Sequence, residues 1–429
     1  MNRTAVVLRV IFRRTVSSTF PSVVIRRLTV STFPSGASFL DPTYGLSESA
    51  VALYEASSAF AEAEVLPHAA LWDANSTFPE AALRSAAAQG FASMWAGVEH
   101  GGSGLTRADS LVVLEGLARA CPSFAAYLSI HGMVAKMVDT YGTSEQRKRL
   151  GPRLASASAF ASYCLTEPGA GSDAVSLKTR ATRDGHGAGG GAASAWRLDG
   201  QKAFISGGGR SDVYLVMART GGPGAAGLSA FLVDSGAHGL SFGANEKKMG
   251  WKNQPTAAVF FDGVPAELLG VEGAGFKMAM QALDGGRLSI AACSVGAASV
   301  ALDMARTHVV TREQFGKPLA ANQAVSFAIA DMASDVFTAR ATVRAAGAAI
   351  DANHPGARAL CALAKAHATE KGLRVVDQAL QLHGGYGYLT TTGIEKLLRD
   401  VRVHTILEGT SEVMRILLSR AVLEGGKVK

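Results

Sequence analysis

The chain has 429 residues, 48% of them hydrophobic and 18% charged, a balance that excludes an intrinsically disordered protein and predicts two or three globular domains. The net charge is +7, but six arginines in residues 1–40 supply most of it, so residues 41–429 carry only +1. The folded part therefore lacks the basic excess of a nucleic-acid-binding surface, and no uninterrupted apolar run of about 18 residues predicts a membrane span.

Residues 1–40 have the composition of a targeting segment. They are rich in serine, threonine and valine and contain no acidic residue. Arginine-rich, serine-rich segments of this kind are typical of mitochondrial transit peptides, whereas a secretory signal needs an unbroken apolar stretch. We therefore expect delivery to the mitochondrial matrix, with a disordered basic tail as the alternative. The six charged residues are Arg3, Arg9, Arg13, Arg14, Arg26 and Arg27.

Residues 41–158 are predicted to form a helical N-terminal domain. Over Leu46–Glu64, mostly apolar residues recur at the 3.6-residue spacing of one helix face. Pro67 is expected to stop or bend that helix, because proline lacks the N–H that a helix interior uses. Further helices are expected over Ser110–Ala120 and Gly132–Tyr141.

Residues 159–270 predict a β domain. Asp199-Gly200 is a strong signal for a two-residue hairpin turn, and the glycine-rich stretch Asp184–Ser194 is expected to form a longer hairpin tip. Connections this short leave no room for crossover helices, so the sheet should be mainly antiparallel. The expected strands are Phe160–Leu165, Trp196–Leu198, Lys202–Ile205, Val213–Arg219, Leu228–Asp234 and Ala257–Asp262.

Residues 271–429 return to a helical pattern, and long helices with several apolar sides are expected to pack as a bundle. Asp284-Gly-Gly-Arg287 should open the second of these helices and leave room for a ligand, because glycines are unfavourable in a helix interior. The four cysteines have no Cys-x-x-Cys spacing, so neither a metal site nor a disulfide framework is expected. The expected helices are Phe276–Ala282, Leu288–Arg312, Ala324–Ala352 and Leu360–Leu382.

The clearest chemical signal lies near the C-terminus. The glycine-rich turn over residues 381–388 lets a flat ligand approach the backbone, since glycine has no Cβ. One expected helix later, Glu408 follows two apolar residues and precedes Thr410 and Ser411, either of which can cap the final helix. A carboxylate in such surroundings is a candidate base with a shifted pKa. The alternative is a glutamate that precedes a helix for purely local reasons.

Three further stretches suit a ligand with a planar ring and a phosphate group. The turn Tyr163–Asp173 can present converging backbone N–H groups to electronegative atoms. Phe204 and Ser206 lie on the same side of a strand, where they can contact a ring, and Arg312 can contact phosphate oxygens in a fork. The plainer interpretations are a tight turn, a core phenylalanine and a surface arginine.

Together these stretches resemble the acyl-CoA dehydrogenase family over essentially all of residues 41–429. Cys164–Ser176 matches the first family signature, and Gln381–Asp400 matches the second except that Thr391 stands where an acidic or amide residue is usual. Further matches are Arg312-x-x-Phe-Gly and Ile406-Leu-Glu-Gly. The resemblance implies an α+β fold with a helical N-terminal domain, an antiparallel β middle domain and a C-terminal four-helix bundle, assembled as a homotetramer.

The resemblance also implies the ligands and the residues that hold them. FAD would lie between subunits beside an acyl-CoA substrate, with Glu408 as the catalytic base. Residues implied to bind FAD are Tyr163, Cys164, Leu165, Thr166, Gly171, Ser172, Phe204, Ile205, Ser206, Arg312, Phe315, Asn322, Gln323, Gln381, Leu382, His383, Gly384, Gly385, Thr410, Ser411 and Glu412. Residues implied to bind acyl-CoA are Ser172, Asp284, Gly285, Gly286, Arg287 and Arg420.

The implied reaction is the α,β-dehydrogenation of a short branched-chain acyl-CoA, from isobutyryl-CoA to methacrylyl-CoA in valine catabolism. Glu408 would take the α-proton while the β-hydrogen leaves as hydride to the flavin, and electron-transfer flavoprotein would receive the electrons. Isovaleryl-type members carry their base at the position of Gly286, which has no side chain here. Alternatives are a 2-methylbutyryl or straight short-chain substrate, an oxidase of the same family, and a catalytically reduced member with an assembly or scaffold role.

Overall fold

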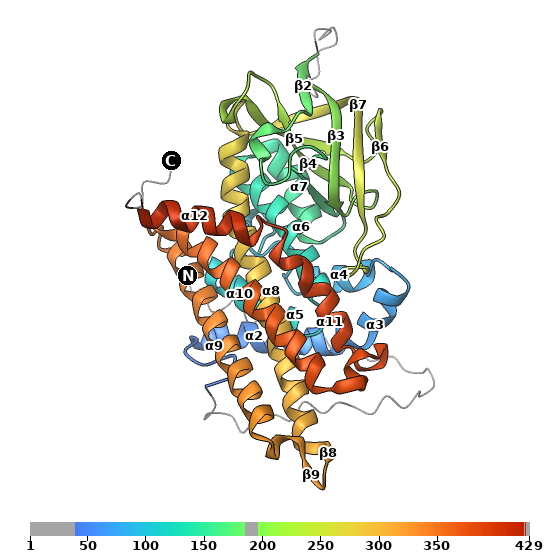
Figure 1. Cartoon of the computed structure of the whole chain (residues 1–429). Helices are drawn as coiled ribbons and strands as arrows, with labels where there is room; N and C mark the ends of the chain where they lie inside the picture. Colours follow the sequence, from blue (N-terminus) through green and yellow to red (C-terminus); the bar gives the residue numbers. More distant parts are fainter. Residues whose placement is uncertain (1–38, 185–195, 424, 426–429) are drawn as a thin grey trace.

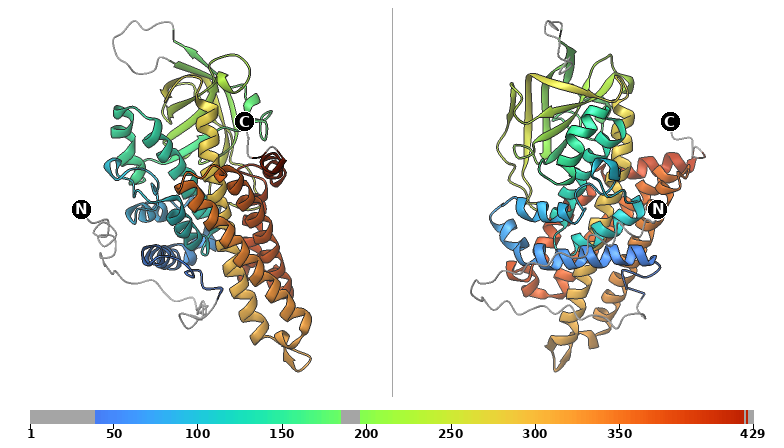
Figure 2. Two further views of the ribbon diagram at one scale, coloured as in Figure 1. Left: turned by 90° about the vertical axis from the view of Figure 1, so that its left-hand side faces the viewer. Right: turned by 180° about the vertical axis from the view of Figure 1, so that it is seen from behind.

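The computed structural model describes residues 39–184, 196–423 and 425. Figure 1 shows a β sheet at one end and a bundle of long helices that extends away from it, and the N-terminal helices pack beside both (Figure 2). This is the α+β architecture that the sequence predicts. Residues 1–38 of the predicted transit peptide and residues 185–194 of the predicted hairpin tip lie outside the described ranges.

The N-terminal region is helical, but its first helix does not stop at Pro67. Helix α2 continues through a π-helical segment, η2, into α3, and Pro67 lies at the start of α3, directly after the π-helical segment. The elements are α2 (Glu48–Phe60), η2 (Ala61–Val65), α3 (Leu66–Ala74), α4 (Glu80–Ala88), η3 (Val98–His100), α5 (Arg107–Ala118), α6 (Pro122–Tyr141) and α7 (Ser144–Ala155).

The middle region forms a seven-stranded sheet that is mainly antiparallel, as expected. Only the pairings of β4 with β1 and β2 are parallel in the described part of the chain. The pairings β4–β2–β3–β7–β5–β4 form a closed ring around an apolar cluster that includes Trp196, Tyr214 and Phe231. The strands are β1 (Ala161–Cys164), β2 (Arg180–Arg183), β3 (Trp196–Ser206), β4 (Val213–Arg219), β5 (Leu228–Asp234), β6 (Leu240–Phe242) and β7 (Thr256–Leu269).

The hairpin turn predicted at Asp199-Gly200 is wrong. Strand β3 runs straight through this dipeptide while paired with β7, and the register shifts between Leu198 and Gly200. Gly200 has a φ of 142°, and a Cβ on it would lie 2.8 Å from the Cα of Thr179. Glycine is therefore required here because the strand has a bulge and another backbone approaches closely. An isolated glycine in a strand often indicates these features instead of a turn.

The prediction that Asp284 to Arg287 opens a helix is also wrong, because α8 runs from Gly275 to Thr311 without interruption. The glycines lie inside the helix because the neighbours leave no space for side chains. A Cβ on Gly285 would lie 2.5 Å from Nη2 of Arg107. The C-terminal helices are α8 (Gly275–Thr311), α9 (Gln323–Asp351), α10 (Ala357–Leu382), α11 (Ile394–Arg402) and α12 (Ser411–Leu423).

Helix α8 is the core of the C-terminal region. It is long and apolar enough to cross a membrane, but 83% of its most apolar window is buried inside the protein, as in the core helix of a globular domain. It packs against α9 and α10, and α11 and α12 lie against α10 (Figure 1). The short hairpin of β8 (Glu313–Gln314) and β9 (Lys317–Pro318) joins α8 to α9 at the far tip of the bundle (Figure 1).

A buried ion pair connects the N-terminal helices to this bundle. Nε of Arg340 on α9 donates to Oε1 of Glu115 on α5 at 2.8 Å, and Nη2 of Arg340 donates to Oγ of Ser299 on α8 at 2.8 Å. All three side chains are buried. Because each helix supplies a charged or polar group that water cannot reach, removing one group leaves the others unpaired.

We predict that Glu115→Ala destabilises the protein by about 3 kcal/mol or more, because the Arg340 guanidinium would then be buried without its counter-charge. Urea unfolding followed by circular dichroism measures this effect. The control is Glu62→Ala, which removes an exposed carboxylate and should change stability by less than about 0.5 kcal/mol. Equal stability of the two variants would contradict the structural importance of the pair.

Candidate active site

Glu408 lies in a short segment between η9 (Val403–Thr405) and α12. Its φ is 56°, and that of Gly409 is 91°, so two consecutive residues have left-handed backbone. Such a conformation is strained for a residue with a side chain. Oε2 of Glu408 is buried and has no hydrogen-bond partner within the described ranges. Burial disfavours the charged carboxylate and raises the pKa of Glu408 to about 7, although nearby cations oppose the shift.

Gly286 of α8 lies directly against this carboxylate. A Cβ on Gly286 would lie 2.4 Å from Oε2 of Glu408 and 2.8 Å from its Cδ. Any side chain at position 286 would therefore displace the carboxylate. An acidic side chain at position 286 and the side chain of Glu408 would compete for the same space, so the structure has room for only one of them.

Two buried cations contact the segment that carries Glu408. Nε of Arg287 lies 3.4 Å from the carbonyl oxygen of Glu408, and Arg287 also forms an ion pair with Asp284. Nζ of Lys365 on α10 donates to the carbonyl oxygen of Gly409 at 2.6 Å. Burial lowers the pKa of Lys365 to about 8. Lys365 is not among the residues predicted from the sequence, because it is one of two lysines in α10 and no local pattern distinguishes it from Lys371.

The end of β1 brings Tyr163 near the same carboxylate. The Tyr163 hydroxyl is buried and, within the described structure, makes no hydrogen bond. Burial raises the pKa of Tyr163, and the charge of Glu408 raises it further. Because this electrostatic interaction requires proximity, the ring end of Tyr163 and the carboxylate of Glu408 belong to one site.

The loop after β1 is held by a buried ion pair that the sequence analysis also missed. Oε1 of Glu167 accepts from Nζ of Lys202 at 2.8 Å and from the N–H of Thr179 at 2.9 Å. Oε2 accepts from the N–H of Lys178 at 2.6 Å, and Nζ of Lys202 also donates to the carbonyl of Leu165 at 3.1 Å. The loop therefore has a defined shape before any ligand binds, which lowers the entropy cost of binding.

Phe204 presents its ring to the surface beside this loop. Its side chain is 67% exposed and its φ is 57°, so it is not the core phenylalanine of the plainer interpretation. The adjacent Ile205 is buried, and Ala203 donates its N–H to the carbonyl of Thr166 at 2.9 Å. An exposed aromatic ring on a rigid strand is suited to contact a planar ligand.

A cavity of about 380 Å³ lies where the end of α8 meets the glycine turn η7 (Gly384–Tyr388). The rings of His308 and His383 stack with their centroids 4.3 Å apart, and the guanidinium of Arg312 lies 5.9 Å from the ring of Tyr386. His308 precedes Arg312 by four residues, a helical spacing that could have identified it. Predicted residues in the lining are Arg312, Leu382, His383, Gly384 and Gly385; the others are His308, Gln314, Leu319, Tyr386 and Leu389.

The remaining predicted residues are more dispersed. Thr410 accepts from the N–H of Val413 at 3.2 Å and so caps α12. Phe315 is 97% exposed at the tip of the β8–β9 hairpin. Arg420, on α12, makes no hydrogen bond or ion pair with Asp284–Arg287 in the described part of the chain. Thr410, Ser411 and Glu412 line a second cavity of about 240 Å³ together with Glu370, Arg402, Thr405 and Ile406. Residues at exposed positions of loops or helix ends are Gly171, Ser172, Gln323 and Gln381, whereas Cys164 is buried and Asn322 half-buried.

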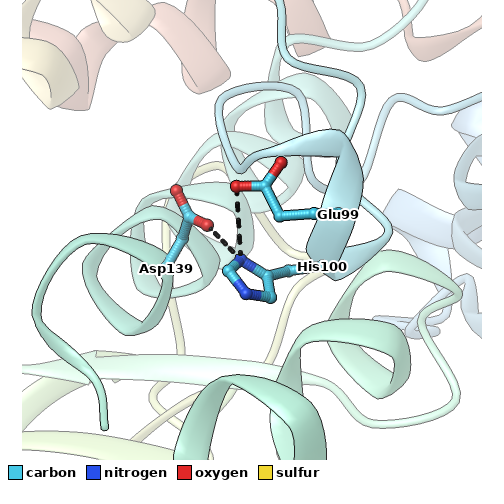
Figure 3. A group of neighbouring side chains, drawn as sticks. All are labelled: Glu99, His100 and Asp139. Atoms are coloured by element: carbon cyan, nitrogen blue, oxygen red, sulfur yellow. Dashed lines mark hydrogen bonds and ion pairs between the residues drawn. The ribbon is translucent and has the colours of Figure 1, made fainter. Parts of the chain in front are cut away.

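A third group, Glu99, His100 and Asp139, brings ligand-type atoms together (Figure 3). Nδ1 of His100 lies 2.7 Å from Oδ1 of Asp139 and 3.8 Å from Glu99. Lys136 already pairs with the other oxygen of Asp139 at 3.1 Å, and the side chain of Glu99 is 71% exposed. These contacts are those of a hydrogen-bonded link between η3 and α6.

Three family models match the chain in succession. They are described as "Acyl-CoA dehydrogenase, N-terminal domain" over residues 47–158, "middle domain" over residues 162–264 and "C-terminal domain" over residues 273–423. Together they cover most of the chain and follow the helical, β and helical regions of the structure.

Individual relatives agree with these matches. The chain is 47% identical to isobutyryl-CoA dehydrogenase, mitochondrial, of Bos taurus over 390 residues, which are 90% of this chain and 92% of the relative. It is 47% identical to the protein of the same name from Dictyostelium discoideum, over 89% of this chain and 90% of that one. The structure of butyryl-CoA dehydrogenase from Megasphaera elsdenii matches with a TM-score of 0.84 and 31% identity, over 89% of this chain and 99% of that one.

The raised pKa of Glu408 has a consequence for stability. A carboxyl group with a folded pKa of about 7 instead of 4.5 binds its proton more tightly in the folded state, so the wild type loses stability as pH rises through this window. We predict that Glu408→Gln is more stable than the wild type at pH 8, on the order of 2 kcal/mol, and that the gain disappears near pH 4.5. Thermal unfolding of the FAD-loaded proteins across pH measures it. A difference that does not depend on pH would contradict the shifted pKa.

Proposed function

The chain belongs to the acyl-CoA dehydrogenase family, whose members are FAD-dependent oxidoreductases, and from this premise we propose that it converts isobutyryl-CoA to methacrylyl-CoA in valine catabolism. The observation that carries the proposal is the buried Glu408 carboxylate, which has a pKa near neutrality and faces a glycine. The choice of substrate is supported by the 47% identity to two proteins named isobutyryl-CoA dehydrogenase.

The residues of this chain fit FAD. The exposed ring of Phe204 and the ordered loop after β1 suit the flavin ring, and the cavity beside Arg312 suits the charged and aromatic parts of a nucleotide. We assign Tyr163–Ser172 and Phe204–Ser206 to the flavin ring. Arg312 and residues 381–385 are assigned to the FAD of a neighbouring subunit. FAD held by these residues would supply the acceptor for the hydride that leaves the β-carbon of the substrate.

Glu408 acts as the base in the proposed reaction. A proton next to a thioester carbonyl is only weakly acidic, so the base needs a pKa near the working pH and a site without water. Burial of the carboxylate supplies the raised pKa at Glu408. Gly286 leaves room for the carboxylate itself, because any side chain at this position would displace it.

The backbone of Glu408 contributes a second group. Within the described residues its N–H donates to no protein acceptor. This N–H can therefore donate to the thioester oxygen, where negative charge develops as the proton leaves. Arg287 and Asp284, with the exposed Ser172 and Arg420, are assigned to the acyl-CoA chain.

We propose a homotetramer in the mitochondrial matrix that passes its electrons to electron-transfer flavoprotein. Exposed aromatic residues at the end of the bundle support assembly, since Phe315 is 97% and Tyr388 82% exposed. The arginine-rich segment 1–40 and the mitochondrial relatives support the location. The family resemblance supports the electron acceptor.

Glu408→Gln is predicted to lower kcat by at least about a thousandfold, because the amide cannot accept the α-proton. FAD content and the affinity for isobutyryl-CoA should stay close to those of the wild type. Anaerobic bleaching of the flavin absorbance by isobutyryl-CoA measures the chemical step directly. Glu145→Gln, an exposed change on α7, is the matched control and should bleach at the wild-type rate. Near-normal kcat in Glu408→Gln would refute the assignment of the base.

A panel of acyl-CoA substrates tests the proposed specificity. We predict the highest kcat/KM for isobutyryl-CoA. For 2-methylbutyryl-CoA, which has one more methylene, and for butyryl-CoA, the straight-chain isomer, kcat/KM should be lower by roughly tenfold, the order of discrimination that an apolar pocket gives for such small changes of shape. A higher kcat/KM for butyryl-CoA would assign the enzyme to straight short chains. Absence of turnover with all three substrates in the FAD-loaded protein would favour the scaffold alternative.

A further inference from the structure

Two consecutive backbone carbonyls beside the candidate base are contacted by cations from two different helices. Arg287 of α8 contacts the carbonyl of Glu408, and Lys365 of α10 donates to the carbonyl of Gly409 at 2.6 Å. These are the two residues with left-handed backbone, with φ values of 56° and 91°. The left-handed part of the segment, in which Glu408 has a conformation unfavourable for a residue with a side chain, is therefore also the part that other helices contact.

Lys365 is an unfavourable residue for this position unless it has a specific role. Its relative exposure is 0%, and the alanines on either side along α10, Ala364 and Ala366, are buried as well. Its hydrogen-bond acceptor is a neutral carbonyl and not a carboxylate, so most of the desolvation penalty of the ammonium is not offset by an ion pair. An apolar side chain of similar length would fill the same space at lower cost in stability.

We propose that Lys365 is a positioning residue for the base: with Arg287 it fixes the strained segment so that the carboxylate and the backbone N–H of Glu408 both keep their places, and its charge favours the ionised carboxylate. This inference rests on the proposed function, because it assigns Lys365 through Glu408. Lys365 itself acts without touching the substrate.

The charged and titratable groups around Glu408 give the sign of the electrostatic effect. Arg287 and Lys365 both lower the pKa of Glu408 against the larger effect of burial. The charge of Glu408 in turn raises the pKa of Lys365, with smaller contributions from Glu370 on α10 and Glu412 on α12. The other groups are Tyr163 on β1, Asp284 paired with Arg287, and His404, whose pKa burial and then Lys365 lower to about 3. Removing the ammonium therefore raises the pKa of Glu408.

The experiment compares Lys365→Met, Lys365→Arg and the control Lys371→Met in the FAD-loaded protein. Lys371 lies on the same helix but is part-exposed and pairs with Asp335 at 2.9 Å, away from Glu408. The readouts are flavin content and kcat for isobutyryl-CoA as a function of pH. The pH at which activity reaches half of its plateau reports the ionisation of the base.

For Lys365→Met we expect a plateau kcat lower by about tenfold or more, because a base displaced by a fraction of an ångström loses alignment. The half-activity pH should rise by about one unit, and flavin content should stay unchanged. Lys365→Arg should keep the wild-type half-activity pH, since it keeps the charge, but lose part of the plateau because the guanidinium cannot reach the same point. Lys371→Met should match the wild type in both the plateau kcat and the half-activity pH.

Three outcomes would overturn the inference. A wild-type plateau and half-activity pH in Lys365→Met would show that Lys365 does nothing for the base. An equal loss of kcat in Lys365→Met and Lys365→Arg, with no shift of the half-activity pH in either, would show a merely structural role. If Lys365→Met does not fold, a shifted half-activity pH in Lys365→Arg overturns it instead. Full activity of Glu408→Gln would refute the proposed function separately, whatever the lysine variants do.

Discussion

The site depends on a single steric constraint, the contact between the Glu408 carboxylate and Gly286. No Cβ fits between the carboxylate and helix α8, so the absence of a side chain at position 286 is what allows Oε2 of Glu408 to be buried there. Burial without a hydrogen-bond partner for Oε2 then shifts the pKa toward neutrality. The chemistry proposed for this protein follows from that shift, because a carboxylate with the pKa of an exposed glutamate would be a weak base.

Helix α8 organises the elements around this contact. Over one turn it supplies Gly285, which lies against Arg107 of α5, then Gly286 against the carboxylate, and then Arg287 beside the carbonyl of Glu408. Its burial against α9 and α10 keeps this turn in place, and Lys365 holds the base segment from α10. The strain of the left-handed segment is thus balanced by contacts with two rigid helices, in agreement with the tendency of strained residues to occur at functional sites.

A second constraint is that the candidate FAD-binding residues belong to two different parts of the fold. The ring of Phe204 and the loop after β1 belong to the sheet, whereas the cavity beside Arg312 lies where α8 ends against the turn after α10 (Figure 1). Exposed Phe315 lies in the hairpin that follows α8, and exposed Tyr388 lies in η7. Other residues of α8 and η7 line that cavity. In the proposed homotetramer, contact of this region with another copy would give both the exposed aromatic rings and the cavity a function.

Local sequence determined the strands β4 and β5, whose ends were predicted to the residue, because a short continuous run of apolar residues is a property of neighbouring residues. A short local motif also singled out Glu408 as a candidate base, which stays a prediction. Asp199-Gly200 and Gly285-Gly286 were misread as a turn and a helix start. A glycine reports only that a side chain is missing, and the reason was a close contact with Thr179 in one case and with Arg107 and Glu408 in the other. Only the tertiary structure could decide the roles of Lys365 and Lys202, since their partners lie 44 and 35 residues away and no local pattern encodes which distant carbonyl or carboxylate a buried lysine will meet.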